Sequence, residues 1–220
     1  VLDDDEEGVS RYSKQMLRLT TEMIEESKEL LKAMGIPVIE APSEAEAQCS
    51  YMCKKKDVYC VGSQDFDCFL FGSPRLALNL TLSHKRKIIG GRQIFISPYM
   101  VELQEVLDKL EVNQEELILL GIMVGTDFNP GGIKGIGPKK ALKLVGKSPD
   151  EIFKDVDFDW KAIYDIFHNH PVKKDYVLDF KEVDEEKVKE ILMSREFSEE
   201  RIESGLARIR KKEQGLGKWM

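Results

Sequence analysis

Residues 62–72 read GSQDFDCFLFG and place two aspartates inside an otherwise apolar stretch. The segment before them, VYCV (58–61), is rich in β-branched and aromatic residues, which predicts a short strand. Asp65 and Asp67 stand two residues apart, so in an extended segment both carboxylates would point the same way. Burying two anions costs several kcal/mol unless they are paired, protonated or bound to a metal. The stretch therefore predicts a strand that ends at a carboxylate site.

The segment upstream predicts a second strand and a helix. PVIE (37–40) reads as a short strand, and APSEAEAQ (41–48) begins a helix expected to run to about residue 55. Strand, helix and strand at this spacing predict a βαβ unit with parallel strands. The carboxyl ends of such strands meet at one edge of the sheet, where α/β folds bind ligands.

This arrangement brings two glutamates to the same edge as the two aspartates. Glu44 and Glu46 follow the first strand, and Asp65 and Asp67 follow the second. Four like charges cannot share one place without cations, and crowded carboxylate oxygens suit Mg²⁺ or Mn²⁺ rather than zinc. An alternative without a ligand stays open for the first pair, since Ser43-x-x-Glu46 is also the pattern of a capping box.

Residues 125–145 read GTDFNPGGIKGIGPKKALKLV and combine a fifth carboxylate, Asp127, with tight glycine turns. Pro138 stands at the first position of a predicted helix, whose free backbone N–H groups would form a phosphate site. The lysines around it are Lys134, Lys139, Lys140 and Lys143. A helix, a two-part turn and a helix can hold one strand of a duplex by its phosphates without reading its sequence. The alternative is an ordinary glycine-capped loop with solvated lysines.

The composition fits a globular protein of one or two domains. The 220 residues are 42% hydrophobic and 33% charged, and no apolar run is long enough to cross a membrane. The net charge of −7 argues against a general nucleic-acid binder, yet residues 129–149 hold five lysines and no acidic residue. The four cysteines indicate reduced thiols in a cytosolic or nuclear protein. Zinc is the alternative, although no CxxC pair occurs.

Periodicity and capping residues predict the remaining elements. One long helix is expected over 9–34, ended by Gly35, and strands are expected over 75–81 and 92–97. A helix should begin at Pro98 and another at Asn113.

The region 150–212 is expected to be helical with polar connections, its last helix capped by Ser198. Alternating aspartates in KDVDFDW (154–160) predict a solvated turn and a helix cap. The predicted fold class is therefore α/β, with a mixed, largely parallel central sheet flanked by helices, a helix–two-turn–helix DNA-binding element and a helical C-terminal region.

Four stretches together resemble one known family. APSEAEAQ, SQDFDCFLFG, GTDFNPGGIKGIGPKKAL and SEERIESGL match, in order and spacing, the flap structure-specific endonucleases of DNA replication and repair. The resemblance runs from about Arg11 to the C-terminus, and NPGGIKGIG is similar to the archaeal branch. It implies that 5′ flaps are cut from branched DNA by two-metal hydrolysis of a phosphodiester. It also implies a cytoplasmic protein at the nucleoid, or a nuclear one in a eukaryote, with no membrane partner.

The same resemblance implies roles for individual residues. The catalytic ligands of two divalent ions, Mg²⁺ or Mn²⁺, would be Glu44, Glu46, Asp65, Asp67 and Asp127. The residues that grip the duplex would be Lys134, Gly135, Gly137, Lys139, Lys140 and Lys143. Arg195 and Phe197 would lie near a pocket for a one-nucleotide 3′ flap. The carbonyls of Gly132, Ile133 and Ile136 would bind a monovalent cation such as K⁺.

Two features depart from the family pattern. The family places its N-terminus, two more aspartates and most of a helical arch before the point where this chain begins. We therefore expect an incomplete metal site and an inactive isolated chain, completed by an N-terminal segment of the same enzyme or by a separate chain. The tail KKEQGLGKWM approximates a sliding-clamp motif through Leu216, Trp219 and Met220, but Glu213 stands where glutamine belongs. Clamp binding and a frayed tail both stay open.

These interpretations divide the chain into four regions. Residues 1–20 would be an acidic lead-in and the end of the arch, and residues 21–125 the C-terminal part of the nuclease core. Residues 126–200 would contain the helix–two-turn–helix and a helical DNA-binding region, and residues 201–220 the terminal helix and the tail.

Three other functions remain as alternatives to the flap endonuclease. They are a non-catalytic duplex-binding module, a related 5′ exonuclease, and a Mg²⁺-dependent phosphatase or sugar-nucleotide transferase. The last of these would not need a lysine-lined turn.

Overall fold

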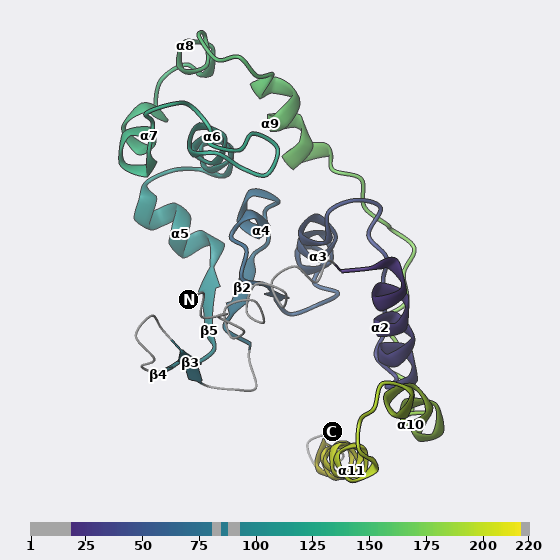
Figure 1. Cartoon of the computed structure of the whole chain (residues 1–220). Helices are drawn as coiled ribbons and strands as arrows, with labels where there is room; N and C mark the ends of the chain where they lie inside the picture. Colours follow the sequence, from purple (N-terminus) through teal and green to yellow (C-terminus); the bar gives the residue numbers. More distant parts are fainter. Residues whose placement is uncertain (1–18, 81–84, 88–92, 217–220) are drawn as a thin grey trace, which may run out of the picture. The chain divides into compact units, whose positions relative to one another are not determined.

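The computed structural model describes residues 19–80, 85–87 and 93–216 (Figure 1). These residues pack as two compact units. One unit comprises residues 40–174, and the other comprises residues 19–39 together with 175–216. The four functional regions expected from the motifs stay a prediction.

A small mixed sheet lies in the 40–174 unit. Its strands are β1 (Val61–Gly62), β2 (Arg75–Leu78) and β5 (Tyr99–Glu102), in the order β1-β2-β5. β1 is parallel to β2, and β2 is antiparallel to β5. A separate antiparallel pair joins β3 (Lys85–Lys87) to β4 (Gln93–Phe95). The α/β class is confirmed, but among the described strands the sheet is mixed rather than largely parallel.

Two predicted elements are wrong. Residues 37–40 form no strand, so the expected βαβ unit is absent and the parallel neighbour of β1 is β2. The helix expected from Pro98 begins only at α5 (Leu103–Leu110), because the residues before it form β5. Tyr99 and Val101 favour strands, and their pairing with β2 outweighs the helix-start signal of Pro98.

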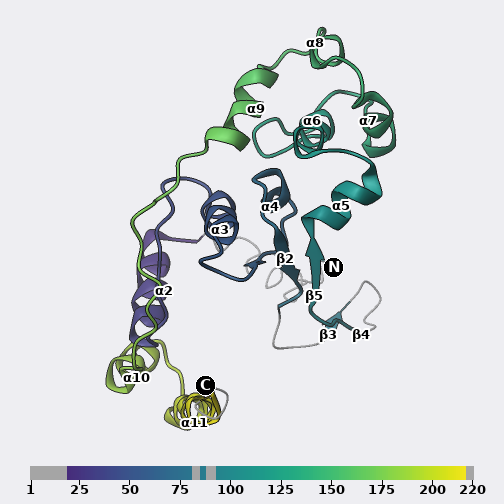
Figure 2. The ribbon, with the colours of Figure 1, turned by 180° about the vertical axis from the view of Figure 1, so that it is seen from behind.

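The helices of this unit surround a core centred on α6 (Gln114–Val124). Ile118, Ile122 and Met123 of α6 are at most 1% exposed. α6 packs against α7 (Pro138–Leu144) and against α9 (Trp160–Asn169), between which it lies in Figures 1 and 2. The remaining helices are α3 (Ala45–Lys54), α4 (Asp67–Leu70) and α8 (Pro149–Ile152). The capping box of Asn113 with Glu116 begins α6 as the sequence predicts, and all four cysteines are free thiols.

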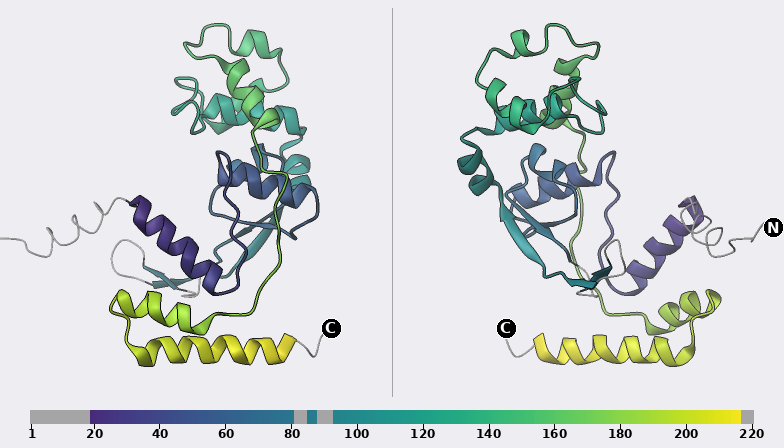
Figure 3. Two further views of the ribbon diagram at one scale, coloured as in Figure 1. Left: turned by 90° about the vertical axis from the view of Figure 1, so that its right-hand side faces the viewer. Right: turned by 60° about the vertical axis from the view of Figure 1, so that its left-hand side comes forward.

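The second unit is a helical cluster of α2 (Thr21–Ala33), α10 (Glu185–Ser194) and α11 (Glu199–Leu216). Figure 3 shows α10 and α11 side by side, joined by a short turn. Gly35 ends α2 as predicted, with φ +72, and a Cβ there would lie 2.0 Å from the carbonyl oxygen of Lys181. A glycine is needed because the segment after Asp175 passes so close to this turn.

No helix among the described residues is long and apolar enough to cross a membrane.

Candidate metal centre and nucleic-acid interface

Three separate segments of the 40–174 unit supply the carboxylates of one small cavity. The cavity has a volume of about 130 Å³, and its walls include Phe71 and Phe128. Its carboxylates are those of Glu44, Glu46, Asp65, Asp67 and Asp127. All five acidic residues that the sequence pointed to thus line the same space, and none of the described residues lining it is a lysine or an arginine.

Glu44 and Glu46 lie at the N-terminus of α3. Glu44 is the N-cap residue, and no side chain caps the helix there. Ser43 stands one residue before the N-cap, so the alternative of a capping box with Glu46 is wrong. The backbone N–H of Glu44 instead donates to Nε2 of His170, at 3.1 Å. No pattern in the sequence pointed to His170, which lies in a polar connection after α9.

Asp65 and Asp67 lie in a turn that begins α4, rather than in the extended segment expected. The N–H of Asp65 donates to Oγ of Ser63 at 3.1 Å, and the N–H of Asp67 donates to Oδ1 of Asp65 at 2.9 Å. The apolar residues that follow are buried, and Oγ of Ser50 in α3 donates to the carbonyl of Cys68 at 3.1 Å. The apolar stretch therefore anchors the turn to α3, while the carboxylates reach the cavity.

Asp127 lies in a loop held by a buried polar pair. Thr126 donates its N–H and its hydroxyl to Oδ1 of Asn129, at 3.1 and 2.8 Å. Nδ2 of Asn129 donates to the carbonyl of Ile122 at 2.7 Å, which ties the loop to α6. Thr126 and Asn129 are each only 7% exposed. Sequence reasoning missed this pair, although Asn129-Pro130 is a recognisable turn signal.

The charges around the cavity are unbalanced. The pKa of Asp67 is raised to about 6, first by burial and then by the negative charges of Asp65, Asp127, Glu46 and Glu44. Carboxylate oxygens are the donors that Mg²⁺ and Mn²⁺ take, so the donor set and its uncompensated charge fit such ions. Within the described ranges, no three acidic, histidine or cysteine side chains lie in a geometry that could hold a metal ion. Carboxylates that face one another without a cation repel each other, and this repulsion keeps them further apart than metal ligands lie.

The turn between α6 and α7 depends on glycine at a close backbone approach. Gly132 has φ +53, and a Cβ there would lie 2.4 Å from the carbonyl oxygen of Met123. That carbonyl accepts the N–H of Ile133 at 2.9 Å, and the Ile133 carbonyl accepts the N–H of Ile136 at 2.9 Å. One of the three carbonyls expected to bind a monovalent cation thus already accepts a hydrogen bond. The lysines of the turn are exposed: Lys134, Lys139, Lys140 and Lys143.

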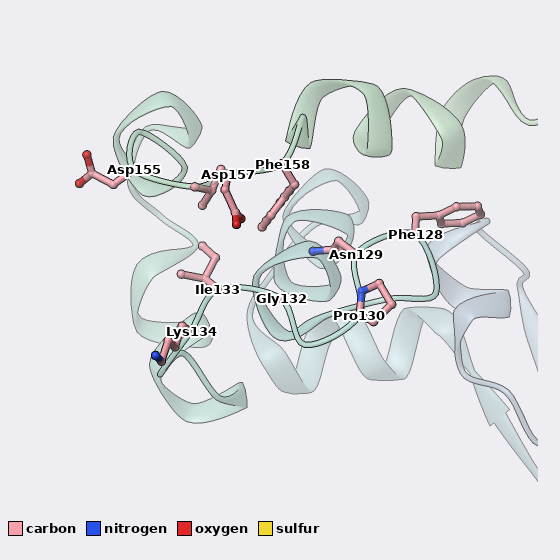
Figure 4. A pocket seen from close by; sticks show the side chains of 10 residues that line it. Phe128, Asn129, Pro130, Gly132, Ile133, Lys134, Asp155, Asp157 and Phe158 are labelled. Carbon is pink, nitrogen blue, oxygen red and sulfur yellow. The ribbon is translucent and has the colours of Figure 1, made fainter.

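A larger cavity, of about 770 Å³, lies between this turn and the loop before α9 (Figure 4). One wall consists of Phe128, Asn129, Pro130, Gly132, Ile133 and Lys134, and the other consists of Asp155, Val156, Asp157 and Phe158. Figure 4 shows Asp157 turned toward the cavity and Asp155 pointing away from it. Asp159 accepts the N–H of Ala162 at 3.1 Å and caps α9, which confirms the helix cap predicted for these alternating aspartates.

The other unit carries the two residues expected near a 3′ flap. Arg195 follows α10, and its Nε lies 2.6 Å from Oε1 of Glu26 in α2. Phe197 is 43% exposed, with the guanidinium of Arg201 5.4 Å from its ring centroid. The clamp-binding prediction concerns Trp219, Met220 and the side chain of Leu216, which lie outside the described residues.

Comparisons with known proteins agree with the family resemblance. The XPG I-region family model matches residues 35–127. Flap endonuclease 1 of Pyrococcus abyssi is 48% identical over 94% of this chain and 62% of its own length. That of Hyperthermus butylicus is 41% identical over 98% of this chain and 67% of its own length.

A solved structure has the same fold. The flap endonuclease-1 of Methanococcus jannaschii matches 92% of this chain and 61% of its own chain, with a TM-score of 0.77 and 39% identity. The chain spans about three-fifths of the length of the curated relatives it matches. On these matches, the chain belongs to the flap endonuclease family.

Proposed function

We propose that this chain carries five metal ligands and the duplex-gripping turn of a structure-specific endonuclease that cuts 5′ flaps from branched DNA in replication and repair. The observation that carries the proposal is the convergence of five carboxylates on one cavity without a cationic side chain among its lining residues. The glycine- and lysine-rich turn begins within the same loop as Asp127, so a DNA strand held by the turn would reach the carboxylates.

In this proposal the five carboxylates hold two Mg²⁺ or Mn²⁺ ions. When bound, such ions make a water more acidic and stabilise the leaving oxygen of a phosphodiester. The chain itself contributes by anchoring the three segments that carry its ligands. The Asp65 turn, the Asn129 network and the His170 contact each hold one ligand segment.

DNA would bind through the turn between α6 and α7. The lysines Lys134, Lys139, Lys140 and Lys143 would contact phosphates, and the backbone near Gly135 and Gly137 allows a close approach because it carries no side chains. The lysines matter most, since α7 has only seven residues and its dipole is small. The carbonyls of Gly132, Ile133 and Ile136 are the proposed site for a K⁺ ion.

The proposal extends to Arg195 and Phe197 as contacts for a 3′ nucleotide. Arg195 is exposed but paired with Glu26, so a phosphate would have to replace that carboxylate. The exchange is chemically reasonable because a guanidinium binds carboxylate and phosphate with the same planar geometry. The tail is proposed to bind a sliding clamp through Leu216, Trp219 and Met220.

We further propose that the isolated chain is inactive. The resemblance implies two more aspartates in an N-terminal segment, supplied by the same enzyme or as a separate chain. An apolar groove of about 520 Å³ adjoins Asp67 and is lined by Leu70, Leu117, Leu120 and other apolar side chains of α4 to α7. Phe66 at its rim is 52% exposed. We propose that a segment bringing two further aspartates to the cavity would contact this groove, because the groove adjoins Asp67.

Cleavage of a labelled 5′-flap substrate in Mg²⁺ tests the proposal. The chain would be assayed alone and mixed with the N-terminal part of a flap endonuclease relative, with Asp65→Asn as the variant. Asp155→Asn is a matched control, because Asp155 also belongs to a stretch of alternating aspartates but is outside the carboxylate cavity. Activity in the mixture that Asp65→Asn removes and Asp155→Asn keeps supports the proposal.

Two alternatives give other results in the same experiment. A non-catalytic duplex-binding module would bind the substrate but cleave nothing in any mixture, and Mg²⁺ would not stabilise its fold. A 5′ exonuclease would release single nucleotides from a blunt or recessed 5′ end in preference to an intact flap.

A further inference from the structure

A short segment after α9 is attached directly to the helix that carries two of the proposed ligands. We call residues 170–174 (HPVKK) the strap. Nε2 of His170 accepts the backbone N–H of Glu44 at 3.1 Å. Gln48, one turn further along α3, donates Nε2 to the Lys173 carbonyl at 3.0 Å and accepts the Lys173 N–H on Oε1 at 2.7 Å. The strap therefore fixes α3 at two points.

These attachments differ in character. Gln48 is only 3% exposed and is paired in both directions, so it acts as a buried clamp on the strap backbone. His170 acts at the N-cap, where helices ordinarily rely on a side chain from the helix itself. Since α3 lacks such a side-chain cap, the imidazole is the partner of the Glu44 backbone N–H, while the Glu44 carbonyl accepts the N–H of Gln48 at 3.2 Å.

The His170 ring also touches the other two ligand segments. Its centroid lies 5.1 Å from that of Phe71, the residue after α4, in an edge-on arrangement. It lies 6.5 Å from the ring of Phe128, the neighbour of Asp127. Phe71 and Phe128 both line the carboxylate cavity. One imidazole thus contacts the three segments that supply all five carboxylates.

The hydrogen bond fixes the form of this ring. Nε2 accepts a hydrogen bond from the backbone N–H of Glu44, so Nε2 carries a lone pair and the N–H of the neutral ring is on Nδ1. Nδ1 is buried without a hydrogen-bond partner among the described residues. A buried N–H without a partner lowers the stability of the folded protein, so holding His170 against Glu44 costs folding free energy.

We propose that His170 is a positioning residue for the carboxylate site. It sets the position of Glu44 and Glu46 relative to Asp67 and Asp127, and Gln48 holds the strap so that the ring stays in place. The inference rests on the proposed function, because it treats these carboxylates as metal ligands. Removing a residue that orients metal ligands without binding the metal itself typically weakens metal binding by roughly 10- to 100-fold.

Mn²⁺ binding to the 220-residue chain, measured by isothermal titration calorimetry, tests the proposal. His170→Phe keeps the ring but removes the acceptor, and should weaken Mn²⁺ binding about tenfold. His170→Gln places an amide oxygen where Nε2 was, and should restore the affinity to within about threefold of wild type. His168→Phe is the matched control: His168 pairs with Glu115 at 2.8 Å and is outside the cavity.

The outcomes separate this inference from the proposed function. Wild-type affinity in His170→Phe, or an equal loss in His170→Gln, would overturn the positioning role while leaving a metal-binding wild type intact. A wild-type chain that binds no Mn²⁺ either alone or mixed with the N-terminal part of a flap endonuclease relative would overturn the proposed function itself. Should His170→Phe fail to fold, Gln48→Leu tests the second attachment, and unchanged Mn²⁺ affinity in that variant would also overturn the inference.

Discussion

Two stretches of this chain alternate aspartates, and the structure gives them different surroundings. Asp65 and Asp67 share a cavity with three further carboxylates, and the pKa of Asp67 is raised to about 6. Asp155 is 85% exposed and has Lys154 within 3.6 Å, while Asp159 caps α9. The spacing of the aspartates is the same, so spacing alone does not make a metal centre.

The difference arises from what the rest of the chain brings to each stretch. Burial of the CFLF segment anchors the first pair against α3 and α6. Glu44 and Glu46 lie at the start of α3, and Asp127 lies in the loop after α6. The second stretch faces the lysine-bearing turn across a wide cavity (Figure 4). The carboxylates of the first stretch therefore lie among other carboxylates, whereas in the second stretch Asp155 is exposed to solvent and Asp159 caps a helix.

The largest expected difference between the two aspartate stretches is in the rate of flap cleavage. In the completed enzyme, Asp65→Asn should lower the rate constant for flap cleavage about a thousandfold, because it removes charge that holds the metal ions. Asp155→Asn should stay within about twofold of wild type, as expected for an exposed surface charge. Single-turnover kinetics in Mg²⁺ measure both, and similar losses in the two variants would contradict the comparison.

Asn129→Ala should destabilise the loop that carries Asp127 in the carboxylate cavity. It leaves the N–H of Thr126 and the carbonyl of Ile122 unpaired in a buried place, which should cost about 2–3 kcal/mol in the free energy of unfolding. Urea denaturation measures the loss. Asn169→Ala is the control, because the Asn169 side chain donates to exposed Asp165 in α9 and its loss should change stability by less than about 0.5 kcal/mol. Equal losses would mean that the Asn129 network is not structurally special.

The sequence predicted the five cavity carboxylates but not what holds them. Glu44 and Asp67 were expected to converge because each would follow a strand of a βαβ unit; both line the cavity, although residues 37–40 form no strand. His170 and Gln48 act across more than 120 residues, and a histidine in a polar connection carries no local signal. The Asp65 turn was misjudged as extended, since the hydrogen bond that starts α4 depends on local geometry and not on hydrophobic alternation.

The fold was predicted in the same uneven way. The ends of α6 after Asn113 were predicted nearly correctly, and so was the C-terminal end of α2 before Gly35, but α2 begins at Thr21 after the N-cap Thr20 and is not part of one helix over 9–34. Strands depend on partners elsewhere in the chain, so β5 was mistaken for the start of a helix and residues 37–40 for a strand. Tertiary pairing decided both cases.

Asp67→Asn should stabilise the metal-free protein. The raised pKa means that the charged form of Asp67 is unfavourable in the folded state, so a neutral side chain removes the cost of burying that charge and its repulsion by the other carboxylates at pH 7. After allowance for solvent screening at a partly exposed site, the gain should be about 1 kcal/mol, or roughly 2–4 °C in Tm. Thermal unfolding in a chelator measures it, with Asp155→Asn as the unchanged control.

In Mg²⁺, the wild-type protein should become more stable than Asp67→Asn. At a concentration 100 times its Kd, an ion stabilises a protein that binds it by about 2.7 kcal/mol, and Asp67→Asn should lose most of that gain. If Asp67→Asn lowered Tm in the chelator, or if Mg²⁺ raised both proteins equally, the cavity would not be a site of unbalanced charge.

The smallest expected effect concerns the second stretch. Asp157 is turned toward the cavity that it shares with Lys134, so its charge lies on the side where the turn would hold a phosphate. Asp157→Asn should tighten duplex DNA binding about twofold at low salt, because one weak repulsion of phosphate is removed. Asp155→Asn, whose side chain points away, should leave the affinity unchanged. Fluorescence anisotropy at about 50 and 200 mM salt distinguishes them, since a charge effect fades as salt rises. A gain for Asp157→Asn that persisted at high salt would show that the carboxylate acts on the fold of the turn rather than on DNA.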